Sequence, residues 1–195
     1  MTALSWTLAV FLATSTSSPP DSGAPPRSAA RAYLEAVLRG DAGSALALVA
    51  DPSDADRFVV RAHAASADAL RRLEDVATSR FGARGDLGIA ARHRRLLASL
   101  DHAPLEVSGD RAVLHPEGGK PFRLRRVLGK WKVESPAERL TGEEQRALER
   151  TLKETEAAAQ DLAGQIRARA VKSAEEAREA LRKALGQGQQ EGVPL

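Results

Sequence analysis

The stretch that decides the fold is Leu105–Glu134, which reads LEVSGDRAVLHPEGGKPFRLRRVLGKWKVE. It contains four short runs in which apolar and polar residues alternate, and turn-forming residues separate these runs. Alternation with a period of two is typical of strands that bury one face, and short turns join neighbouring strands antiparallel. The predicted strands are Leu105–Val107, Arg111–His115, Phe122–Val127 and Lys130–Glu134.

The alternation also assigns the two faces of this antiparallel meander. The apolar face, which we expect to be buried, carries Leu105, Val107, Ala112, Leu114, Phe122, Leu124, Trp131 and Val133. The opposite, charged face carries Glu106, Arg111, Arg123, Arg125, Lys130 and Lys132. A sheet that buries one face needs helices to cover that face, so the sequence predicts an α+β fold with N-terminal helices packed on the meander.

Helical periodicity precedes the meander. Apolar residues at three- and four-residue steps predict a helix over 28–38, a short helix that ends before Asp51, a long helix over about 54–80, and a fourth helix before Pro104. The side chains expected to begin these helices, in order, are those of Ser28, Asp41, Asp54 or Asp56, and Asp86. The apolar side chains expected to be buried by the fourth helix are Leu96, Leu97 and Leu100.

One long amphipathic helix is predicted for Thr141–Leu185, opened by a capping box between Thr141 and Glu144. Its apolar stripe carries Leu148, Leu152, Ala159, Leu162, Ile166, Ala170, Ala177 and Leu181. Unbroken, the helix would be on the order of 65–70 Å long, which exceeds the width of the preceding domain, and Gly164 is the expected hinge. Three arrangements stay open: the helix packs back on its own domain, pairs with a second copy as a weak coiled coil, or acts as a spacer.

The chain begins with an apolar decamer, Leu4–Ala13 (LSWTLAVFLA). A membrane-spanning helix needs about 20 residues, so the decamer is too short to span and has instead the length of a signal-peptide core. Its defect as a signal is the segment 1–3, which has no Lys or Arg, and the alternative is an apolar tail or a core helix. We expect an exported bacterial protein, periplasmic or secreted, with no transmembrane span.

These patterns divide the chain into five segments. The Ser- and Pro-rich composition that follows the decamer cannot form a core and predicts a linker. The predicted segments are a signal peptide at 1–15, a disordered linker at 16–27, an α+β domain at 28–135, a long amphipathic helix at 136–186 and a disordered tail at 187–195.

Several classes of chemistry lack the residues that they require. The chain has no cysteine, which excludes disulfides, cysteine zinc sites, iron–sulfur clusters and thiol nucleophiles. No glycine-rich phosphate loop occurs, and we predict no cofactor and no metal, because the histidines lie on different predicted elements without ligand spacing. These histidines are His63, His93, His102 and His115. The net charge of +3 is modest and no aromatics interleave the basic residues on the charged face, so nucleic acid is not an expected partner.

Two stretches carry a family resemblance. The first is AYLEAVLRGD (Ala32–Asp41) with ALALVA (Ala45–Ala50), and the second is GKWKV (Gly129–Val133). In this order of elements they resemble the NTF2-like superfamily, particularly its small exported bacterial members. The resemblance spans 28–135 and leaves the C-terminal helix outside. It implies an NTF2-like or cystatin-like fold, in which a curved sheet wraps around a helix and leaves a cone-shaped pocket or a dimerising sheet face.

The side chains that would line such a pocket are Tyr33, Asp56, Phe58, Phe122 and Trp131. Tyr33 matches the place of a tyrosine in ketosteroid isomerase-like members of the superfamily. The position of their carboxylate base falls on Arg57, with Asp56 beside it, so this chain departs from the enzymatic pattern. We therefore expect no catalytic activity.

Three functions remain as hypotheses. The first is a non-catalytic exported domain that binds a small ligand or a protein partner in the cell envelope, with a homodimer as one form. The alternative is a structural or interaction protein that acts through its C-terminal helix. The third is an isomerase-type enzyme that uses Tyr33 and Asp56 for proton transfer.

Two basic clusters are candidate surfaces for an anionic partner. One is Arg92–Arg95 on the fourth predicted helix, and the other lies on the charged sheet face. The members of the second are Arg123, Arg125, Lys130 and Lys132. The alternative is a solvated face whose arginine stems cover apolar surface.

Overall fold

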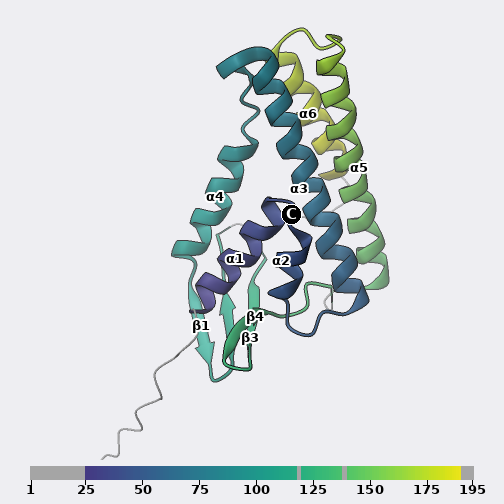
Figure 1. Ribbon diagram of the computed structural model, residues 1–195. Helices are drawn as coiled ribbons and strands as arrows, with labels where there is room; N and C mark the ends of the chain where they lie inside the picture. Colours follow the sequence, from purple (N-terminus) through teal and green to yellow (C-terminus); the bar gives the residue numbers. More distant parts are fainter. Residues whose placement is uncertain (1–24, 118–119, 138–139, 190–195) are drawn as a thin grey trace, which may run out of the picture.

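The computed structural model describes residues 25–117, 120–137 and 140–189 (Figure 1). These residues form six α-helices, a short 3₁₀ helix and a four-stranded antiparallel sheet, which confirms the predicted α+β class. The predicted signal peptide lies outside the described residues, as do most of the predicted linker and tail. None of the described helices combines the length and apolar character that crossing a membrane requires.

The meander prediction is confirmed strand by strand. The strands are β1 (Leu105–Ser108), β2 (Arg111–Leu114), β3 (Phe122–Val127) and β4 (Lys130–Val133), paired antiparallel in the order β1-β2-β3-β4. Leu124 lies opposite Ala112 on one side and opposite Val133 on the other, so the apolar residues share one face.

Residues 48–50 run beside β4 in a short parallel bridge. The Ala50 amide donates to the Val133 carbonyl at 2.8 Å, and the Val133 amide donates to the Leu48 carbonyl at 2.8 Å. These two hydrogen bonds satisfy backbone groups at the β4 edge of the sheet. The opposite edge of the sheet is β1.

The helices α1 (Pro26–Leu38) and α2 (Ala42–Ala47) cover the apolar face of the sheet (Figure 1). The cluster that they enclose with the sheet includes Ala30, Tyr33, Leu34, Val37, Val49, Leu114, Leu124, Trp131 and Val133. The predicted buried face is wrong at Val107, whose side chain is 55% exposed. Val107 lies near the end of the edge strand β1 and belongs to none of the apolar clusters.

The starts of the first two helices differ in how well they were predicted. α1 begins at Pro26, inside the segment predicted as linker, with Pro25 as its N-cap. Proline suits the first helical position because its missing N–H and fixed φ cost nothing there. Ser28 therefore lies within the first turn and is not the cap. The Asp41 cap of α2 is confirmed, since its carboxylate accepts from the Ser44 amide at 2.9 Å.

The prediction of a single long C-terminal helix is wrong. α5 (Gly142–Arg167) ends well before Leu185, and a separate helix, α6 (Ala174–Gln189), continues into the predicted tail. Arg169 in the connection has a φ of +61°, so the chain turns there and not at Gly164. α5 and α6 both pack against α3 (Asp54–Phe81), which confirms that the helix packs on its own domain (Figure 1).

A second apolar core explains this hairpin. It joins Leu73 and Ala77 of α3 to Leu162 and Ile166 of α5 and to Leu181 of α6. A single extended helix would leave the apolar stripe of its second half in water, whereas the hairpin buries both halves. The predicted capping box at the start of α5 is confirmed: the Glu144 carboxylate accepts from the Thr141 amide at 2.8 Å, and the Thr141 hydroxyl accepts from the Glu144 amide at 3.2 Å.

The helix α4 (Ile89–His102) follows a 3₁₀ turn at Gly82–Gly85 and links the two cores. Gly88 is its N-cap, so Asp86 does not cap it as predicted. Glu74 of α3 does so instead: its carboxylate accepts from the Ile89 amide at 3.0 Å and from the Ala90 amide at 2.9 Å. A negative charge at a helix N-terminus is stabilising because it neutralises free N–H groups and the helix dipole.

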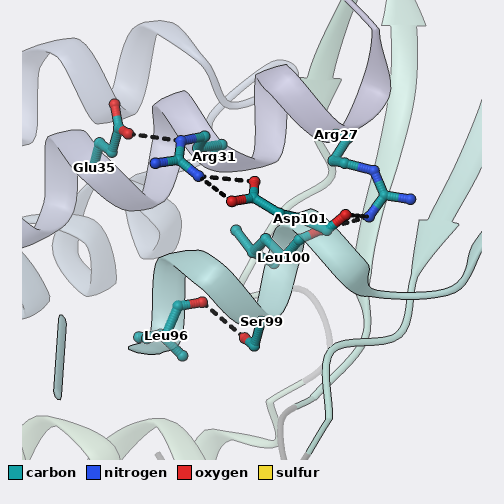
Figure 2. Close-up of polar contacts among 7 residues, drawn as sticks. All are labelled: Arg27, Arg31, Glu35, Leu96, Ser99, Leu100 and Asp101. Carbon is teal, nitrogen blue, oxygen red and sulfur yellow. Dashed lines mark hydrogen bonds and ion pairs between the residues drawn. The ribbon is translucent and has the colours of Figure 1, made fainter. Parts of the chain in front are cut away.

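The C-terminus of α4 is held by two arginines of α1 (Figure 2). Arg27 donates to the carbonyls of Leu100 and Asp101 at 2.5 and 2.9 Å, and the Nη1 of Arg31 donates to both oxygens of the Asp101 carboxylate, at 2.8 and 2.7 Å. These cations complement the negative end of the helix dipole.

Between its two ends α4 is packed more loosely than predicted. Leu100 is buried, Leu97 is half-buried and Leu96 is 41% exposed. The prediction that all three are buried is therefore wrong, because only the two ends of α4 reach the apolar cores.

We predict that Glu74→Ala lowers the free energy of unfolding by about 1–2 kcal/mol, the range measured for lost helix caps. Urea denaturation followed by circular dichroism measures it. The matched control is Glu154→Ala, which removes an exposed glutamate of α5 that has no bonded partner among the described residues. Equal losses in the two variants would contradict the capping role.

Candidate functional site

The structure divides the five predicted pocket residues among different surroundings. Tyr33, Phe122 and Trp131 meet in the core under the sheet, where the Tyr33 and Phe122 rings pack edge to face with centroids 6.5 Å apart. Phe58 packs instead in a third cluster with residues of α5, and the Lys153 ammonium lies 5.9 Å from its ring centroid. These rings are parts of packed cores, and a ligand pocket among them stays a sequence-based prediction.

Asp56 has a structural role. Its buried carboxylate accepts four hydrogen bonds: from the Ser53 amide at 3.0 Å, the Ser53 hydroxyl at 2.7 Å, the Ser135 hydroxyl at 2.6 Å and the Ala137 amide at 3.0 Å. Ser53 is the N-cap of α3, so Asp56 completes its capping box and is not itself the cap. The same carboxylate therefore ties the start of α3 to the segment between β4 and α5.

The pKa shifts of Asp56 and Tyr33 are opposite to those that proton transfer between them at neutral pH would require. Burial acts to raise the pKa of Asp56, but the hydrogen bonds that its charged form accepts outweigh burial and bring the pKa below its usual value. Burial, helped by the charge of Asp56, raises the pKa of Tyr33 to about 12. No hydrogen bond joins the two side chains in the described part of the chain. A general base needs a raised pKa and a hydrogen-bonded path to its proton.

We predict that Asp56→Asn lowers the free energy of unfolding at pH 7 by about 2–3 kcal/mol, because an amide nitrogen would face donors that need an acceptor. The folded-state pKa lies below the usual 3.8, so the carboxylate's contribution is present above about pH 5 and is lost as the pH falls through the usual value toward the folded one. The difference in the free energy of unfolding between wild type and variant should therefore be smaller at about pH 3 than at pH 7. Urea denaturation at both pH values measures it.

The control for this variant is Asp54→Asn, which changes an exposed carboxylate in the same first turn of α3. It should cost well under the loss at Asp56, since exposed ion pairs contribute little. A difference between wild type and Asp56→Asn that stays constant from pH 7 to pH 3 would contradict the assignment.

Two shallow hollows lie along α3 and α5, away from all five residues. The first has a volume of about 330 Å³, with a floor of alanines and a rim that includes Asp68, Arg72, Glu156 and Arg167. The second, of about 360 Å³, lies farther along α3 and shares Arg167. Their rims mix both signs of charge, so neither hollow favours one class of ligand by its electrostatics.

The histidines do not gather. In residues 25–117, 120–137 and 140–189, no group of three His, Asp or Glu side chains could hold a metal ion. Burial lowers the pKa of His63, so this side chain on α3 stays neutral at physiological pH. Burial likewise lowers the pKa of His93 on α4, with smaller and opposing effects of Glu74 and Arg92.

The feature that does assemble as predicted is the charged outer face of the sheet. The basic sheet face consists of Arg111, Arg123, Arg125, Lys130 and Lys132. Register places Arg111 opposite Arg125 and Arg125 opposite Lys132, which forms a row of three cations across β2, β3 and β4. The apolar clusters lie on the other side of the sheet, and no described helix contributes to a cluster on this face.

Neutralisation on the basic sheet face is incomplete. Arg125 pairs with Asp51 at 2.7 Å, and Arg111 lies 3.9 Å from Glu134. No carboxylate of the described residues lies within 4.0 Å of the charged groups of three other cations. These three are Arg123, Lys130 and Lys132.

Sequence reasoning missed Arg126. It lies opposite Trp131, and its guanidinium carbon is 4.7 Å from the centroid of the indole ring, which is a cation–π contact. Its Nε also lies 3.8 Å from the Asp110 carboxylate. The signal was its place in the alternation, two residues after Leu124, which puts it on the buried face at the rim of the core.

Sequence reasoning also missed the tip of the β3–β4 hairpin, for which the pattern predicts only a turn. The hairpin tip is Leu128–Gly129, with φ angles of +50° and +75°. Positive φ at both positions of a two-residue hairpin loop strongly favours Asn-Gly or Asp-Gly, because a leucine pays steric strain there. The Leu128 side chain is also 98% exposed.

Comparison of the chain with protein-family models, with curated proteins and with solved structures found no match.

We predict that Leu128→Asn raises the free energy of unfolding by about 1 kcal/mol, because asparagine adopts the left-handed conformation more readily and no buried contact is lost. Thermal or urea denaturation measures the change. Leu128→Ala is the matched control: it removes the same apolar surface but keeps a residue that disfavours positive φ, so its stability should stay near that of wild type. An equal gain in both variants would contradict relief of backbone strain.

Proposed function

We propose that this chain is a non-catalytic, exported binding domain that uses its basic sheet face to hold an anionic partner in the cell envelope. The observation that carries the proposal is the set of three cations, Arg123, Lys130 and Lys132, that the fold presents on one face with no carboxylate of the described residues within 4.0 Å of their charged groups. Unneutralised like charges on one surface raise the local potential and favour an anionic partner.

The backbone beneath these cations supports the proposal. They stand on β3 and β4, which are central and bridged strands of the sheet, so their spacing is set by strand register and not by a loop. Val113 lies opposite Arg123 and Val127 lies opposite Lys130 on the same face, and both valines are half-buried. Long basic stems that cover such apolar surface keep their charged ends in water, where a partner can reach them.

The charge of this face argues against a symmetric dimer through the sheet. A twofold interface brings each surface onto its own copy, so cations would face cations. Like charges that meet across an interface cost several kcal/mol. The proposal therefore assigns the basic sheet face to a foreign anionic partner, and it keeps the NTF2-like relationship as its fold assignment, supported by α1 and α2 packed on one face of a meander.

The other functional candidates have less support. The apolar stripe of α5 is buried against α3 and α6, so it offers little surface to a partner. The second basic cluster, Arg92–Arg95 on α4, also has three arginines without a nearby carboxylate among the described residues. It stands on a loosely packed helix with one exposed leucine, and we treat it as the comparison surface in the test.

The test compares two triple variants of equal charge. Arg123→Gln/Lys130→Gln/Lys132→Gln removes the proposed site, and Arg92→Gln/Arg94→Gln/Arg95→Gln removes three cations of α4. Heparin, a soluble polyanion, is the probe. The sheet variant should elute from heparin at lower salt, and the slope of log K against log salt should weaken by about two to three, because three cation contacts are removed and each releases somewhat less than one counterion.

The α4 variant should elute close to wild type. Equal losses in the two variants would reduce the effect to net charge, and a loss confined to the α4 variant would move the site to α4. Either outcome would overturn the proposal. Circular dichroism of both variants checks that the fold is retained.

A further inference from the structure

Three large apolar side chains are exposed in the described part of the chain, and two of them lie at one end of the sheet. Leu128 forms the β3–β4 turn and is 98% exposed; Val107 precedes the β1–β2 turn and is 55% exposed. Both turns point away from α5 and α6, at the end of the sheet drawn lowest in Figure 1. We call this the hairpin end, defined by 107–110 and 128–129.

Leu128 is unfavourable there in two independent ways. Its φ of +50° strains the backbone of any residue with a branched or bulky side chain, and its exposure leaves an entire leucine in water. Asparagine would remove both costs without touching the core. Strained residues that persist in a fold are concentrated at functional sites.

The cations beside the hairpin tip give Leu128 a chemical context. Lys130 follows it by two residues, and Lys132 continues along the same strand on the outer face. Two acidic groups in this part of the structure lie close to arginines: Asp110 lies 3.8 Å from Arg126, and Asp51 is 2.7 Å from Arg125. The hairpin end therefore combines a projecting apolar group with unneutralised cations behind it.

We infer that the hairpin tip inserts into the headgroup region of an anionic phospholipid bilayer while Lys130 and Lys132 contact lipid phosphates. The inference rests on the proposed function for its cations and adds the identity of the partner. A bilayer offers apolar chains and anionic phosphates in two layers, which matches a leucine at the tip with lysines set back from it. A soluble polyanion offers nothing to Leu128.

The geometry of the tip favours a bilayer over a protein partner. Leu128 stands on a projecting two-residue turn, so a protein would need an apolar pocket ringed by carboxylates to receive it. A fluid bilayer accepts a single projecting leucine without a preformed pocket. The cations alone would give weak, salt-sensitive attachment, and the buried leucine adds an attraction that salt does not screen.

The experiment is sedimentation of the full chain with vesicles of phosphatidylglycerol and phosphatidylcholine, and with vesicles of phosphatidylcholine alone. Leu128→Asn should lower the partition coefficient onto the anionic vesicles about tenfold, as expected when a leucine is only partly withdrawn from water. Because this variant is expected to be more stable than wild type, unfolding cannot explain the loss. All variants keep the same N-terminal segment, so the difference isolates the tip.

The matched control is Leu96→Gln, which removes another exposed leucine, on α4, and should leave the partition unchanged. Wild type should bind phosphatidylcholine vesicles at least tenfold more weakly than anionic ones. Retention of Leu128→Asn on heparin should equal that of wild type, since heparin has no apolar layer.

Different outcomes separate the two proposals. If Leu128→Asn partitions like wild type while the triple sheet variant no longer binds vesicles, tip insertion is overturned. The proposal that the basic sheet face binds an anionic partner then stands. If wild type binds heparin but no vesicle, the lipid partner is overturned in favour of a soluble polyanion or an acidic protein. If the triple sheet variant binds both probes like wild type, the proposed function itself fails.

Discussion

The rest of the structure depends on burial of only one face of the meander. α1 and α2 close over the side that carries Leu114, Leu124 and Val133, and this burial fixes the register, because a slip by one residue would turn every side chain to the other face. Once the register is fixed, Arg123 and Arg125 of β3 and Lys130 and Lys132 of β4 have to point outward together. The basic sheet face is therefore a consequence of the same alternation that forms the core, and its rigidity comes from the paired strands.

α3 connects this core to a second one. Its 28 residues extend past the sheet, so its second half needs partners of its own. α5 and α6 supply them by folding into a hairpin, which buries Leu73 between two helices and leaves no long helix free. α4 then spans both cores while packing closely only at its ends, where Glu74 holds one terminus and Arg27 and Arg31 hold the other. Polar contacts replace apolar packing where the helix crosses between cores.

Sequence reasoning succeeded mainly where the deciding interaction is local, although it misplaced the N-caps of α1 and α3. The strands follow from a period of two, and the Asp41 cap and the box at Thr141 involve residues three apart. It failed where the partner is distant: Glu74 caps a helix 15 residues later, Arg31 meets Asp101 at a separation of 70, and Asp56 accepts from Ala137 at a separation of 81. The α5–α6 turn was missed for the same reason, since its apolar stripe is compatible with one helix or two until α3 is placed.

The candidate site was predictable in part, and the part that was missed is the informative one. The alternation of the strands predicts which cations lie on the charged face. A residue in a turn is not part of that alternation, so the sequence pattern does not distinguish Leu128 from any other turn residue. Its meaning comes from a backbone angle and an exposure that only coordinates supply. A surface of lysines and arginines is common on proteins and has a simple explanation in solvation. A leucine held at positive φ in an exposed turn is less common, because backbone preference opposes it and the turn offers no apolar contact in return. The cations and Leu128 lie on one hairpin. The exposed leucine therefore points to a lipid partner, which the cations alone would not specify.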